Sequence, residues 1–92
     1  MLANSGIEPS SFEIMGQTAK ELYAAPSKSV GDSKSWTNPS TGTAGTVEIV
    51  EIRDNCVKLF HRVNVAKPAK TSEVSVWQCR MTDGTWQLNT FD

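Results

Sequence analysis

The 92-residue chain has no long apolar run, no excess of basic charge and no metal-binding arrangement of cysteines. A membrane-spanning helix needs about 20 consecutive apolar residues, and no stretch approaches that length. The net charge of −1 and the absence of a polybasic segment argue against a nucleic-acid partner and against an anionic membrane surface. The two cysteines do not stand in a metal-ligand spacing. We therefore predict no metal and no other cofactor.

The sequence also lacks a recognisable catalytic arrangement. Paired carboxylates would suit hydrolysis, but Glu48 and Glu51 fall on opposite faces of one predicted strand. Asp83 is expected to serve a turn, and the only histidine, His61, has no evident partner. His61 follows the apolar positions of its strand, which predicts burial or an edge position. A reactive thiol is a remote alternative, so we predict that the protein is not an enzyme.

What the sequence does contain is a pair of strands. Residues 56–65 and 72–81 alternate between apolar and polar side chains, which is typical of half-buried strands. Residues 66–69 lie between them and predict the turn of a hairpin. The apolar positions of the first run are Val57, Leu59, Val63 and Val65. A shift of one residue would move all of them to the wrong face, so the pattern fixes the register.

In that register Cys56 lies opposite Cys79, which is close enough for a disulfide. Lys58 lies opposite Trp77 in the same pairing. The alternative is two buried thiols, as in many small cytosolic proteins. The register and the small size of the domain favour the disulfide, which in turn implies an oxidising compartment.

A helix is predicted over residues 11–25. Ser10 and Glu13 have the capping-box spacing, and Pro26 ends the pattern. The helix carries an apolar stripe of the kind that packs on a core, made of Phe12, Met15, Ala19, Leu22 and Tyr23. Residues 1–9 are expected to form a flexible N-terminus.

The remaining segments complete an α+β domain. Residues 26–45 are rich in Ser, Thr, Gly, Asn and Pro and predict a long irregular connection. Residues 46–91 predict four antiparallel strands, the last two joined at Asp83-Gly84. We expect residues 10–92 to form one domain, in which the N-terminal amphipathic helix packs on a four-stranded antiparallel β-meander.

A series of short motifs resembles the C-terminal domain of the bacterial 17 kDa outer-membrane surface antigen family: Trp36-x-Asn38-Pro39-x-x-Gly42-x-x-Gly45-x-Val47, then Cys56, then Cys79-Arg80-x-x-Asp83-Gly84-x-Trp86. The likeness covers residues 36–87 and, loosely, the helix. The chain departs from the family at Val57, where an arginine is usual, and at the turn 66–69. The resemblance implies a non-enzymatic protein of the bacterial periplasm or outer-membrane surface. The family's lipid-attachment cysteine and glycine-zipper segment are absent, so any membrane anchor would lie in a segment outside this sequence.

Two functional hypotheses follow. The first is a structural or binding domain whose partner is an envelope protein or peptidoglycan. Its expected contact surface consists of Trp36, Asn38, Pro39, Lys58 and Trp77. Trp77 is the better surface candidate, because it shares its parity with polar positions. The second hypothesis is a small periplasmic inhibitor of an enzyme, in which the rigid loop 38–42 plugs a cleft.

Overall fold

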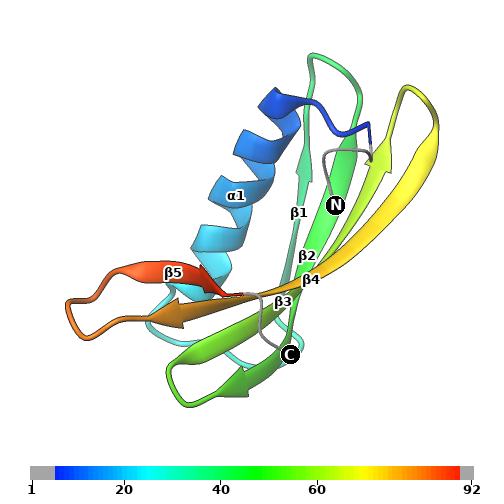
Figure 1. The fold of residues 1–92 in the computed structure, drawn as a ribbon. Coiled ribbons are helices and arrows are strands. Elements are labelled where there is room, and N and C mark those ends of the chain that lie inside the picture. The colour runs from blue at the N-terminus through cyan, green and yellow to red at the C-terminus, as the bar shows by residue number, and fades with distance from the viewer. Residues whose placement is uncertain (1–5, 90–92) are drawn as a thin grey trace.

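One helix and one five-stranded antiparallel sheet make up the computed structural model, which describes residues 6–89 (Figure 1). The elements are, in order, α1 (Pro9–Tyr23), β1 (Ser33–Thr37), β2 (Ala44–Arg53), β3 (Cys56–Val65), β4 (Lys70–Arg80) and β5 (Trp86–Asn89). Neighbours in the chain are neighbours in the sheet. The helix packs on one face, against β1 and β2. The α+β class and the antiparallel meander are confirmed, with five strands where we predicted four. The parts of our predictions on residues 1–5 and 90–92 lie outside the described residues.

The additional strand is β1, within the segment that we predicted to be irregular. It pairs with β2 from Ser33 opposite Glu48 to Thr37 opposite Ala44. Only Trp36 among its five side chains is buried. An edge strand is held by backbone hydrogen bonds on one side, so a single apolar anchor is enough. The alternation that reveals a central strand is therefore missing, and the prediction of a loop was wrong here.

Trp36 is accommodated by the absence of a side chain at its cross-strand partner, Gly45. A Cβ placed on Gly45 would lie 2.6 Å from Cζ2 of the indole. The ring packs between helix and sheet in a cluster that includes Ile7, Met15 and Val63. Ile7 is only 8% exposed, so this residue of the segment that we expected to be a flexible N-terminus packs in the core.

The helix begins earlier than the capping-box pattern indicated. Glu8 is the N-cap and Pro9 the first helical residue, because proline's fixed φ and missing N–H suit the first turn. Ser10 therefore lies inside the helix, and Ser11 Oγ donates to Glu8 Oε1 at 2.5 Å. The helix ends at Tyr23, two residues before the predicted end. Its buried positions are Ser11, Met15, Ala19 and Leu22. Within residues 6–89, no helix is long and apolar enough to cross a membrane.

Asn38 ties the loop after β1 to the start of the helix. Its Nδ2 donates to Oγ of Ser10 and of Ser11, both at 2.9 Å. Its Oδ1 accepts from the backbone N–H of Ser40 at 3.1 Å, and its own backbone N–H donates to Thr43 O at 2.7 Å. The residue is 2% exposed. Its buried amide therefore has hydrogen-bond partners for both its N–H groups and its oxygen, and the bonds from Nδ2 connect the loop to the helix.

The β3–β4 hairpin has the predicted register. Val65 lies opposite Lys70, and the pairing continues to Cys56 opposite Cys79. The two cysteines form a disulfide, with their Cα atoms 4.0 Å apart. The apolar alternation and the cysteine pairing deduced from it are both confirmed. The bond joins the last residue pair of this ladder, next to the β2–β3 turn.

A β-bulge in β2 changes which side chains share a face. The register skips one residue between Ile49 and Glu51. Glu48 and Glu51 consequently lie on the same face, since their partners on β3 are two residues apart. Our expectation of opposite faces was wrong because it assumed unbroken alternation. The bulge also returns Ile52 to the helix side of the sheet, opposite Val57.

Candidate functional site

The five residues that we expected to form a contact surface do not lie on one surface. Trp36 and Asn38 are buried on the helix side, at 6% and 2% exposure, while Pro39 is exposed in the following turn. Lys58 and Trp77 are cross-strand partners on the opposite face of the sheet. The structure thus brings the last two together and separates them from the others. A role for any of these residues in partner binding stays a prediction.

Trp77 is buried, although we expected it at the surface. Its exposure is 3%. The guanidinium of Arg53 lies 5.1 Å from the ring centroid, and Lys58 Nζ lies 5.8 Å from it. Long cationic side chains can cover an aromatic ring with their stems while keeping their charges in water. The alternation of the strand predicted the correct face for Trp77. It could not predict that Arg53 and Lys58, from the β2–β3 hairpin, cover the ring on that face.

His61 is buried among apolar strand neighbours, which agrees with one of its two expected positions. Its cross-strand partners are Val47 and Val74, and its exposure is 4%. Nδ1 is buried with no hydrogen-bond partner among the described residues. Burial lowers the pKa of the imidazole from 6.5 to about 4. The side chain is therefore neutral at pH 7. No group of three potential metal-ligating carboxylate, cysteine or histidine side chains occurs in residues 6–89.

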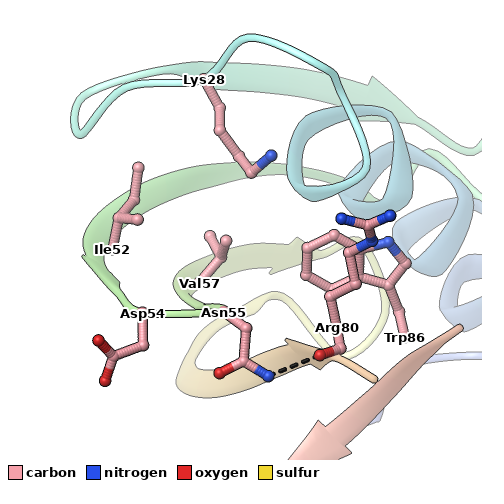
Figure 2. A pocket seen from close by; sticks show the side chains of 7 residues that line it. All are labelled: Lys28, Ile52, Asp54, Asn55, Val57, Arg80 and Trp86. Atoms are coloured by element: carbon pink, nitrogen blue, oxygen red, sulfur yellow. Dashed lines mark hydrogen bonds between the residues drawn. The ribbon is translucent and has the colours of Figure 1, made fainter. Parts of the chain in front are cut away.

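A pocket of about 310 Å³ lies at the disulfide end of the sheet, beside the β2–β3 turn (Figure 2). Its volume is at the lower end of the range for small-ligand sites. The lining residues come from the loop after α1, the β2–β3 hairpin and the β4–β5 hairpin: Lys28, Ile52, Asp54, Asn55, Val57, Arg80 and Trp86. Sequence reasoning did not identify this site.

The pocket has an apolar floor and an aromatic wall. Val57 is 1% exposed and Ile52, beside it, is 39% exposed. The helix ends at Tyr23, so it leaves this part of the sheet uncovered. The Trp86 ring packs against Tyr23 with centroids 5.0 Å apart, and Lys28 Nζ lies 5.7 Å from the Trp86 ring centroid. The indole is thereby fixed in position as a wall.

Two positive groups border the apolar floor. Lys28 Nζ donates to the carbonyl oxygen three residues before it, at 2.8 Å. The Arg80 backbone is held by Asn55, whose O accepts from Arg80 N at 2.8 Å and whose Nδ2 donates to Arg80 O at 2.6 Å. Neither cation forms an ion pair with any described residue. Figure 2 shows the Arg80 guanidinium beside the Trp86 indole, and the Asp54 carboxylate directed away from both.

Comparisons of the chain with protein-family models, with curated proteins and with solved structures find no match. The resemblance to the surface antigen family therefore stays an expectation drawn from short motifs.

Proposed function

We propose that this chain is a non-enzymatic binding domain of the bacterial cell envelope, exported to the periplasm or the outer-membrane surface. The observation that carries this proposal is the disulfide between Cys56 and Cys79. Such bonds persist in oxidising compartments and are rare in the cytosol. With a sequence separation of 23 residues, the cross-link contributes about 3 kcal/mol in the chain-entropy view. A domain this small has a limited core, so that contribution is a large part of its stability.

The motif residues support a surface-antigen-like domain. Trp36 and Gly45 come from different strands and fit against each other. Asn38 connects its loop to the helix. The motif residues therefore make contacts within the fold. We expect chains that contain these motifs in the same order to share this fold.

The binding role is supported by the pocket at the disulfide end of the sheet. The pocket combines an apolar floor, an aromatic wall and two cations, Lys28 and Arg80. This combination can bind a ligand that is partly apolar and partly anionic. Two cations that form no ion pair with a carboxylate of residues 6–89 suit an external anion. Envelope proteins and peptidoglycan both carry carboxylates, and they are the partner classes that we propose.

Fractionation of the cells that produce the protein tests the envelope location in this proposal. The envelope marker proteins and the domain should be recovered together, and both cysteines should resist alkylation until a reductant is added. A cytosolic protein with reduced thiols serves as the control for reagent access. Recovery of the domain with cytosolic markers, with both thiols alkylated at lysis, would contradict the proposal.

A second candidate function is that of a periplasmic enzyme inhibitor. The hydrogen-bonded structure of the loop after β1 favours it. The backbone N–H groups of Thr41 and Gly42 donate to Asn38 O at 3.2 Å and 2.8 Å. Pro39 and Ser40 are exposed at its tip. An envelope pull-down compares the native chain with Ser40→Arg. A stoichiometric enzyme that the native chain inhibits and the variant does not would favour inhibition. Envelope lipoproteins or peptidoglycan retained by both forms would favour the binding domain.

A further inference from the structure

We propose that the pocket lined by Val57, Arg80 and Trp86 binds a carboxylate that is attached to an apolar group. This inference rests on the proposed binding role and narrows it to one ligand chemistry. The shared chemistry is found in small aromatic or branched acids and in the C-terminal residue of a peptide. The two sources are distinguished by experiment below.

The apolar part of the ligand is set by the floor and wall of the pocket. Val57 is buried and Ile52 is exposed beside it, so an apolar group resting on them would remove the Ile52 side chain from water. The Trp86 indole stands at the border of this floor and is already fixed by Tyr23. A wall that does not need to be ordered on binding lowers the entropic cost of association. A volume of about 310 Å³ admits one ring or branched chain and its acid group.

The acid part is set by the two cations. Lys28 uses one hydrogen bond to a backbone carbonyl, which leaves its other donors for a ligand. The guanidinium of Arg80 offers parallel N–H groups that match the two oxygens of a carboxylate. Its backbone is held on both sides by Asn55, so the base of this long side chain is fixed.

Among residues 6–89, no carboxylate forms an ion pair with Lys28 or Arg80. The three ion pairs found among residues 6–89 engage other cations: Lys34 with Glu21, Arg53 with Glu51, and Arg62 with Glu73. The one carboxylate that lines the pocket belongs to Asp54, and it points away from the guanidinium in Figure 2. A ligand carboxylate would therefore meet two cations without displacing a partner from the described part of the chain.

The test is an NMR titration of the ¹⁵N-labelled, oxidised domain with matched acids and amides. The probes are 3-phenylpropionate and its amide, and N-acetyl-glycyl-phenylalanine and its amide. The acids should shift the backbone signals of Val57 and Arg80 and the indole N–H of Trp86. For probes of this size the dissociation constant should be on the order of 1 mM. The amides should bind about tenfold more weakly, since they lack the charge.

Variants identify the groups that hold the acid. Arg80→Gln and Lys28→Gln should each weaken acid binding about tenfold while the thermal midpoint stays unchanged. Lys67→Gln is the matched control: it makes the same charge change in the β3–β4 turn, at the opposite end of the sheet in Figure 1. Tighter binding of the peptide acid would identify a chain terminus as the ligand source, and tighter binding of 3-phenylpropionate a free acid. Either result supports the inference.

The inference would be overturned by equal affinities for acid and amide, by shifts confined to other parts of the sheet, or by an equal loss of affinity in Lys67→Gln. Absence of binding by all four probes would do the same. These failures are distinct from failure of the proposed function, because fractionation and alkylation do not depend on the pocket.

Discussion

Replacing His61 by leucine should abolish most of the loss of stability that the native protein undergoes between pH 7 and pH 5. The imidazole is 4% exposed and its strand partners are valines. Its pKa is about 4 in the folded chain, against 6.5 for an exposed histidine. Below pH 6.5 the unfolded chain therefore binds a proton that the folded chain does not accept. Acid shifts the equilibrium toward the unfolded state until the pH reaches the pKa of His61 in the folded chain. The free energy of unfolding is therefore highest at neutral pH and decreases as the pH is lowered.

The size of the effect follows from the two pKa values of the His61 side chain. One pKa unit corresponds to about 1.4 kcal/mol, so the full difference amounts to about 3 kcal/mol. About 2 kcal/mol of this should be lost between pH 7 and pH 5. Glu8 and Asp83 also have lowered pKa values, chiefly through hydrogen bonds from Ser11 and Thr85. Their contributions are lost only in stronger acid, below the ordinary carboxylate range.

Urea unfolding followed by far-UV circular dichroism gives the free energy of unfolding at each pH, without reductant. The native chain should lose about 2 kcal/mol between pH 7 and pH 5, while His61→Leu should be nearly flat over the same range. The chain has one histidine, so no second imidazole titrates in this interval. Parallel curves for the two proteins would refute the reasoning, because they would show that the acid sensitivity has another origin.

Two further predictions concern packing. Gly45→Ala should lower the free energy of unfolding by about 1–3 kcal/mol, because its Cβ would lie 2.6 Å from the Trp36 ring. Gly16→Ala, at a helical position with no atom within 4 Å of the added Cβ, should instead stabilise by up to about 1 kcal/mol; equal effects in chemical unfolding would contradict the packing described. Trp77→Ala should cost about 3–5 kcal/mol, since the ring is 3% exposed. From the sequence alone we expected Trp77 to act mainly in partner binding and not in stability. An unchanged thermal midpoint in Trp77→Ala would support that earlier expectation and contradict the prediction made from its burial.

Side-chain alternation was enough to predict the β3–β4 hairpin. The valine pattern allowed one register, and that register placed Cys56 opposite Cys79. The reasoning worked because a strand with one buried face constrains every second residue along its length. The apolar stripe of the helix was predicted for the same reason, with a period of 3.6 residues.

The bulge and the edge strand could not be predicted in this way. A bulge adds one residue without any change in composition, so nothing in the sequence marked the point at which Glu51 and Ile52 exchange faces. β1 has one buried residue, Trp36, and its position depends on pairing with β2. Both features are set by tertiary contacts, and local propensity does not record them.

The pocket was missed for a related reason. Lys28, Val57 and Trp86 are far apart in the chain and come together only through the sheet. Ile52 reaches the floor only because of the bulge. The sequence did contain one indication of the pocket. Two apolar residues, Ile52 and Val57, flank the turn at residues 54–55, and the cation Arg80 comes from the next hairpin. Without the bulge, unbroken alternation would place Ile52 on the opposite face of the sheet from Val57, so the pattern of the strand did not indicate this floor.

We propose that the covalent bond between β3 and β4 belongs to the native protein and that the protein therefore resides in an oxidising compartment. This central claim is tested most directly by alkylation and peptide mass mapping of the protein taken from its native source without reductant. We predict a disulfide-linked pair of peptides, one with Cys56 and one with Cys79. Neither cysteine should be alkylated until the protein is reduced. Alkylation of both cysteines in the unreduced protein would contradict the account.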